Sequence, residues 1–94
     1  MLTDAQTHME VTLPTIHLNG TGARTLSNDY RMVCQAVNDT VTALEKAEFH
    51  QRDFYPQGSE AWQNAKAERE EAFRKLKEVK EYAMLWYVNA DDRC

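Results

Sequence analysis

Two long stretches with helical spacing, joined by a short link that contains proline and glycine, limit what this chain can fold into. Over residues 25–50, apolar side chains recur at steps of three and four, the spacing that places them on one face of an α-helix. This face consists of Leu26, Tyr30, Val33, Val37, Val41, Leu44 and Ala47. A first helix is therefore expected over residues 25–50.

A second helix is expected over residues 60–88 for the same reason. Its apolar seam is interrupted by Arg69 and flanked by Phe73, and it consists of Trp62, Ala65, Ala72, Leu76, Val79, Ala83 and Trp86. Between the two helices, residues 51–59 contain the string Tyr-Pro-Gln-Gly, in which proline at the second position and glycine at the fourth match a type I turn. The sequence predicts a mainly α fold, a long antiparallel helical hairpin.

Hydroxyl side chains stand near the expected start of each helix. Thr25 or Ser27 is expected to cap the first helix and Ser59 the second, because a hydroxyl oxygen can accept from the free N–H groups of a first turn. On the outer face of the second helix, an acid precedes a base by four residues in the pairs Glu70 with Arg74 and Glu71 with Lys75.

The residues before the first helix form an arm of two parts. Residues 1–13 are predicted to be a flexible arm, and residues 14–24 an extended or β segment that ends in a turn at Asn19-Gly20. The whole chain, residues 1–94, is one small domain. Two helices bury a single seam, and Tyr82, Trp86 and Tyr87 add aromatic surface beyond it. Assembly as a homo-oligomer is therefore expected.

Composition excludes several classes of protein. The net charge is −4 and is spread along the chain, so a duplex-DNA binder, which needs clustered Lys and Arg, is not expected. The first ten residues lack the pattern of a signal peptide, and no apolar run is long enough to cross a bilayer. Two cysteines, Cys34 and Cys94, make no disulfide framework. We expect a cytoplasmic protein.

Two polar and aromatic segments are the candidate binding site. The first, PTIHLNGTG at residues 14–22, offers His17, Asn19 and Thr21 for polar contacts, with backbone N–H groups from Asn19 to Thr21 that can bind an anion. The second, RDFYPQGS at residues 52–59, offers groups for stacking on a planar base and for binding an anion. Its candidate residues are Arg52, Phe54, Tyr55 and Gln57.

Each segment also has a purely structural interpretation. The first can serve as a strand, turn and cap that leads into the first helix, and the second as a helix–helix turn with Phe54 and Trp62 tucked into the hairpin end. Residues 26–49 of the first helix, roughly 24 residues or about 36 Å at about 1.5 Å per residue, separate the two segments. A shared site therefore requires antiparallel subunits, in which the arm of one chain meets the turn of another.

Catalytic and metal-binding patterns are absent from the sequence. His8, His17 and His50 share no recognised metal-ligand spacing, and Cys34 lies inside a helical pattern with no base beside it, so it is interpreted as a core or interface thiol. No cofactor is expected. The sequence predicts a binding protein, not an enzyme.

The two segments together carry a resemblance. PTIHLNGTG before a first helix and RDFYPQG before a charged second helix resemble a widespread family of short, uncharacterised bacteriophage and prophage proteins, which share an IHLNGT-type arm and a YPQG turn. The resemblance covers residues 14–85. The chain departs from the family pattern at Gly22-Ala23-Arg24, where a serine-led polar stretch is expected, so the resemblance assigns no role to Arg24.

The resemblance implies a phage accessory protein that acts in the cytoplasm of the host bacterium. Small phage proteins of this kind often counter host defence, and one group sequesters cyclic or ADP-ribose-type nucleotide signals. By that analogy, the expected function is to bind and sequester a small nucleotide-like ligand, and the ligand expected is a host anti-phage immune signal. The alternative is a protein-interaction module that inhibits a host protein through its aromatic end, residues 82–87. A structural or morphogenesis factor is a weaker alternative.

Overall fold

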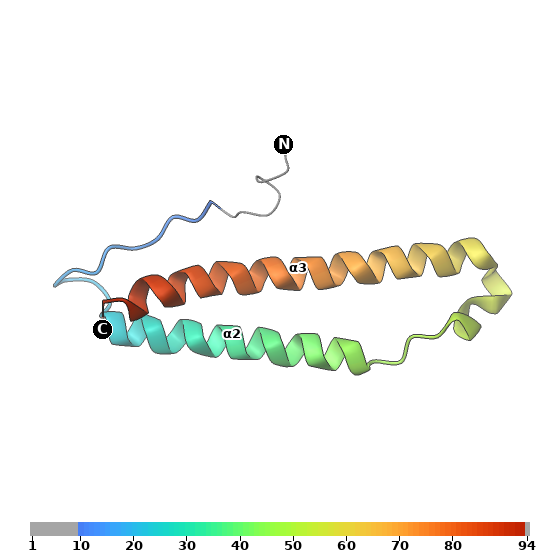
Figure 1. Ribbon diagram of the computed structural model, residues 1–94, viewed down its shortest axis with the longest axis horizontal. Coiled ribbons are helices and arrows are strands. Elements are labelled where there is room, and N and C mark those ends of the chain that lie inside the picture. The colour runs from blue at the N-terminus through green and yellow to red at the C-terminus, as the bar shows by residue number, and fades with distance from the viewer. Residues whose placement is uncertain (1–9, 94) are drawn as a thin grey trace.

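Two long helices and a short one account for most of the chain that the computed structural model describes, residues 10–93. α2 spans Ala23–Lys46, the 3-10 helix η1 spans Gln51–Gln57, and α3 spans Ser59–Asp91. α2 and α3 lie side by side and run in opposite directions, with η1 at the closed end of the pair (Figure 1). The predicted mainly α fold is confirmed.

The segment before α2 is extended but forms no strand within residues 10–22. A turn follows over residues 18–20, and the Gly20 N–H donates to the carbonyl oxygen of His17 at 3.1 Å. The Asn89 side chain donates to the Pro14 carbonyl oxygen at 3.3 Å, which holds the arm beside the C-terminal part of α3. A strand needs a neighbour to pair with, and here a side chain is the partner. Residues 1–9 of the predicted flexible arm lie outside the described residues.

α2 begins without the side-chain cap that the sequence predicts. Gly22 is the N-cap residue, and its carbonyl oxygen accepts the first helical bond from Leu26 N–H at 3.1 Å. Because the helix starts at Ala23, Thr25 lies inside it, beyond the capping position. Ser27 is also inside the helix, is buried, and donates across the hairpin to Asp91 Oδ1 at 3.4 Å. The prediction that Thr25 or Ser27 caps this helix is wrong.

The link between the two long helices contains the 3-10 helix η1 and not only the predicted turn. The Gly58 N–H donates to the Tyr55 carbonyl oxygen at 3.3 Å, which is the bond of the predicted turn, but Pro56 lies within the seven residues of η1. Gly58 has a φ of +94°, a backbone conformation that residues with a Cβ rarely adopt. It is also the N-cap of α3, so the prediction that Ser59 caps this helix is wrong.

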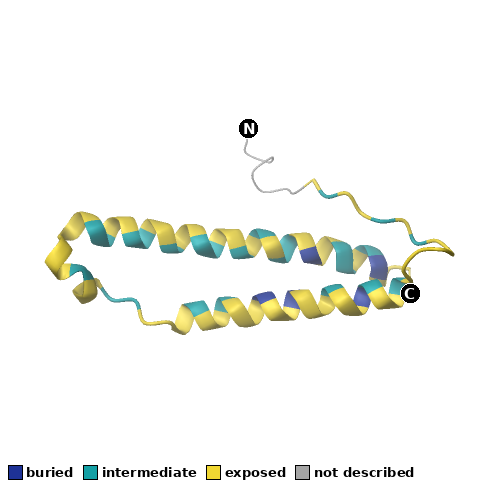
Figure 2. Ribbon diagram, turned by 180° about the vertical axis from the view of Figure 1, so that it is seen from behind, coloured by how far each residue is buried: buried dark blue, intermediate teal, exposed yellow. Residues whose placement is uncertain are grey.

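The buried side chains are few and small. Among the described residues they are Ser27, Cys34, Val37, Ala83 and Ala90. Figure 2 shows these positions in the parts of α2 and α3 that face each other. Cys34 is 8% exposed, as its interpretation as a core thiol requires, whereas Val33, which was assigned to the seam, is 39% exposed. The seam of α2 follows residues 27, 30, 34, 37, 41 and 44, the 3.5-residue period of two helices that wind around each other.

The hairpin is a rod with little interior. Its principal extents are 61, 32 and 17 Å. Its radius of gyration is 18.3 Å, against about 12 Å for a compact domain of this length. No large side chain among residues 10–93 is fully buried. A single chain therefore gains little from burial of apolar surface, and large apolar side chains remain exposed along α3.

Candidate functional site

Three aromatic rings meet at the closed end of the hairpin. The ring centroid of Phe49, which precedes η1, is 4.9 Å from that of Trp62 in the first turn of α3. It is 6.2 Å from that of Phe54 in η1, and Phe54 and Trp62 are 5.7 Å apart. These separations lie within the range of about 4.5–7 Å at which aromatic pairs attract. The cluster fixes the link against the start of α3.

Two cations of α3 lie on this cluster. The Arg69 guanidinium carbon is 4.6 Å from the centre of the Phe49 ring and 5.3 Å from that of Phe73. The Leu44 carbonyl oxygen, in the last turn of α2, accepts from Arg69 Nη2 at 2.8 Å as well as from the Ala47 N–H at 3.3 Å. Lys66 Nζ is 5.6 Å from the centre of the Trp62 ring. Arg69, which the sequence shows only as an interruption of the seam, joins the two helices and the cluster.

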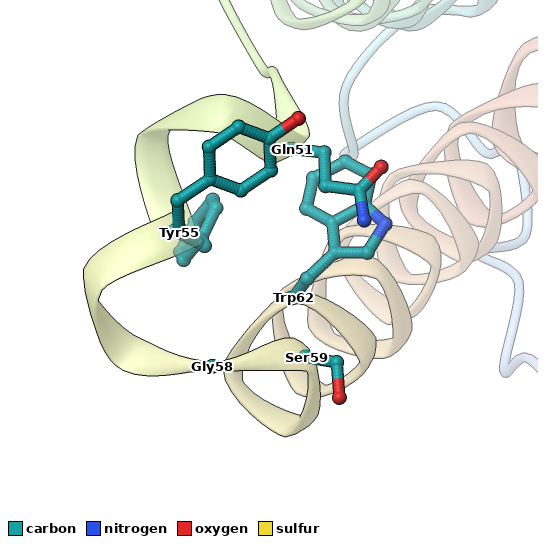
Figure 3. Close-up of a pocket in the computed structure, with 6 residues that line it drawn as sticks. Gln51, Tyr55, Gly58, Ser59 and Trp62 are labelled. Carbon is teal, nitrogen blue, oxygen red and sulfur yellow. The ribbon is translucent and has the colours of Figure 1, made fainter.

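A small cavity opens beside the cluster, between η1 and the start of α3. We call it the cup; its volume is about 110 Å³, and it is lined by Gln51, Phe54, Tyr55, Gly58, Ser59 and Trp62. Figure 3 shows the Tyr55 and Trp62 rings on opposite sides of this space, with the Gln51 amide beside the indole. The Ser59 hydroxyl points away from both rings (Figure 3). The cup is therefore mainly aromatic, with one amide at its rim.

The structure brings only some of the predicted turn residues to the cup. Phe54 and Tyr55 line it, and Tyr55 is 69% exposed, so one face of its ring is open to a ligand. Arg52 and Gln57 are exposed on η1 but do not line the cup. Sequence reasoning assigned no site role to Gln51, although in a 3-10 helix its place three residues before Phe54 puts the two side chains on the same side.

The predicted arm residues lie elsewhere. His17, Asn19 and Thr21 are exposed around the turn that precedes α2. A Cβ on Gly20 would stand 2.8 Å from the imidazole of His17, so that ring lies against the glycine backbone. The Gly20 N–H, expected to be free for an anion, is already bonded to the His17 carbonyl oxygen. One of the backbone donors expected for an anion, that of Gly20, is therefore occupied within the turn.

One chain does not bring arm and turn together. The arm joins the first residue of α2, and η1 follows the last, so the 24 residues of α2 separate them by about 36 Å (Figure 1). The candidate residues of the two segments thus form two groups at opposite ends of α2. Only a second chain can place one beside the other.

Among residues 10–93, no three His, Cys, Asp or Glu side chains gather in a way that could hold a metal ion. Glu48 and His50, in the segment before η1, form a close pair with 2.5 Å between Glu48 Oε1 and His50 Nε2. In the same residues, no helix is both long and apolar enough to cross a bilayer.

Comparisons of the chain with protein-family models, with curated proteins and with solved structures find no match.

Proposed function

We propose that this chain is a bacteriophage accessory protein, a binding protein and not an enzyme, that sequesters a small nucleotide-like ligand in the cytoplasm of its bacterial host. The observation that carries the proposal is the open Tyr55 ring beside the aromatic cluster, with Arg52 exposed on the same short helix. Aromatic faces stack on bases, and a guanidinium binds phosphate or carboxylate through paired hydrogen bonds.

The size of the cup supports a site completed by a second chain. Small-molecule sites are commonly about 300–1,000 Å³, so a cavity of about 110 Å³ is too small to enclose a nucleotide. A homo-oligomer in which the arm of one chain meets the turn of another adds His17, Asn19 and Thr21 to Arg52, Tyr55 and Gln57. In such an assembly the extended arm also finds a neighbour with which to form the predicted strand.

The test is calorimetric titration of the protein with cyclic dinucleotides, cyclic trinucleotides and ADP-ribose derivatives. For a compound that binds, Tyr55→Ala, Arg52→Ala and Asn19→Ala are each expected to weaken affinity tenfold or more, since a base stacked on an aromatic ring contributes roughly 1–3 kcal/mol. These side chains are exposed, so the helical content of the variants should stay unchanged. Silence across the panel with folded protein would count against this function.

The alternative is a protein-interaction module that inhibits a host protein. It is favoured by the apolar side chains that α3 exposes near its C-terminal end, where Tyr82 is 40%, Leu85 40% and Val88 45% exposed. A helix that is apolar on all sides is normally covered on all sides. Tyr82→Ala separates the two functions. If the turn is the site, this substitution should leave nucleotide binding unchanged. If Tyr82→Ala instead abolishes binding of a host protein and Tyr55→Ala leaves that binding intact, the alternative is favoured.

A further inference from the structure

We infer that Leu18 of one chain inserts into the cup of a second copy. This inference rests on one part of the proposed function, namely that the arm of one chain meets the turn of another. It names the contact that joins the two chains. It does not depend on which ligand binds.

Leu18 is placed as an anchor for a partner. It is 98% exposed, more than any other large apolar residue described, and it stands at the tip of the turn that the Gly20-to-His17 hydrogen bond closes. Its neighbours in the arm behave differently, since Pro14 and Ile16 are partly covered. A short turn thus holds one leucine almost entirely in water, and removal of that side chain from water by another surface would be favourable.

The cup matches this side chain in size and chemistry. A cavity of about 150 Å³ is enough to hold one benzene ring, so a cavity of about 110 Å³ suits a single aliphatic side chain. Rings of Phe54, Tyr55 and Trp62 supply an apolar lining. Apart from Gly58 and its two chain neighbours, nothing lies within 4 Å of the position of a Cβ on Gly58, so the backbone of an incoming arm has room at that edge. The Gln51 amide can bond that backbone.

The occupant is a second copy and not the same chain. α2 holds the arm about 36 Å from the cup of its own chain. Two hairpins that lie antiparallel place each arm beside the other chain's η1, so both cups are filled and the contact closes as a two-fold pair. With Leu18 inserted, the residues on either side of it, His17 and Asn19, come next to the exposed Tyr55.

Disulfide trapping tests the contact without any ligand. Chains of different mass carrying Leu18→Cys and Gln51→Cys, each with Cys34→Ala and Cys94→Ala, are mixed, unfolded, refolded together and oxidised mildly. A disulfide requires Cα atoms within about 7 Å, so a mixed disulfide dimer is expected to dominate. The control pairs are Leu13→Cys with Gln51→Cys, which moves the arm cysteine by five residues, and Leu18→Cys with Lys77→Cys, which moves its partner to an exposed site on α3.

Cross-linking of Leu18→Cys to Gln51→Cys at or below the level of both controls would overturn the inference. A second measurement is the oligomer mass of Leu18→Asp, which should fall, whereas Leu18→Met and Leu13→Asp should keep the parent mass. An unchanged mass for Leu18→Asp also overturns it.

Failure of the proposed function gives a different result. In that case the mixed disulfide forms and Leu18→Asp dissociates, but no nucleotide in the panel binds. If instead a nucleotide binds equally to the parent and to Leu18→Asp, and the disulfide does not form, the docking of Leu18 is wrong while the binding function stands.

Discussion

At the scale of single residues, Arg69 carries contacts to three parts of the molecule. It donates to the Leu44 carbonyl at the end of α2, lies over the Phe49 ring of the link, and lies over Phe73 of its own helix. A guanidinium can do this because its flat face stacks on rings while its edge donates hydrogen bonds. The charge is half-buried, yet it is hydrogen-bonded, so a polar residue in an apolar seam is tolerated.

Replacement of this residue should therefore be costly. Arg69→Met keeps an unbranched side chain but removes the hydrogen bond and both cation–π contacts, and we expect a loss of roughly 1.5–3 kcal/mol, the range for a hydrogen bond to a charged group. Urea denaturation followed by circular dichroism measures it. Arg74→Met, at an exposed position of the same helix, is the matched control and should change the unfolding midpoint much less. Equal effects would contradict the bridging role of Arg69.

The residues that sequence reasoning misplaced share a physical cause. Periodicity predicted the seam through Val33, but the structure buries Cys34 and Ser27, because the seam follows the 3.5-residue period of paired helices. Apolar character alone could not find Ser27, which is buried with its hydroxyl bonded to Asp91. The role of Arg69 depends on Leu44 and Phe49, which lie far from it in the sequence.

At the scale of elements, the approach of α2 to α3 depends on alanine. Ala83 is 0% and Ala90 1% exposed, so no space is free at these two small side chains. Beside them the Tyr30 and Trp86 rings stack with centroids 4.7 Å apart. Sequence patterns predicted the existence of both helices but not where each one starts. The N-cap residues are Gly22 and Gly58, which have no side chain that could mark the position.

Enlarging Ala83 tests this packing. Ala83→Leu adds three carbon atoms where no space is free, and we expect it to destabilise the hairpin by about 1–3 kcal/mol. The same substitution at Ala67, which is exposed on the same helix, should be nearly neutral, since leucine and alanine are both good helix formers. Thermal melting of both variants decides it. A tolerant Ala83→Leu would mean that the two helices separate easily.

The outer face of α3 carries a charge network that differs from the predicted pairs. Arg74 donates to the Glu71 carboxylate and, at 2.6 Å, to Glu78, instead of pairing with Glu70. Its hydrogen bonds, with the positive charges of Arg74 and Lys75, hold the pKa of Glu71 below its ordinary value despite some desolvation. The pKa of Arg74 is raised by the same hydrogen bond and by both carboxylates, so it stays charged at every pH of interest.

This network should give a small acid dependence of stability. Because the pKa of Glu71 is lower in the folded protein than in the unfolded chain, its contribution is complete above the ordinary value of 4.5 and is lost as the pH falls through the lowered one. The range from about pH 5 to about pH 3 brackets the titration of the carboxylate. Over this range we expect Glu71→Gln to lose slightly less thermal stability than the parent protein, and the difference is small because the pair is exposed. Melting temperatures of parent and variant that fall by the same amount over this pH range would contradict this.

At the scale of the whole molecule, the hairpin is long and thin, and a single chain covers little of its own apolar surface. Its shortest extent is 17 Å, which leaves room for hardly more than one layer of helices. Val79 and Val88 are 47% and 45% exposed, and Leu18 is almost free of contact. The sequence alone predicted exposed apolar surface from its single seam, but not the cup, because Gln51 and Trp62 come from different elements, η1 and α3.

Stability should consequently depend on protein concentration. If folding and association are linked, the midpoint of thermal unfolding rises with concentration, because mass action favours the associated, folded form. We expect a clear rise between about 1 and 100 μM for the parent chain, and a mass by light scattering that is a multiple of 10.9 kDa. Leu18→Asp should lower the oligomer mass and weaken the dependence, whereas Leu13→Asp should preserve both. A midpoint that is independent of concentration, with a mass of 10.9 kDa throughout, would show that the hairpin is stable alone and that its exposed leucine and aromatic rings serve some partner other than a second copy.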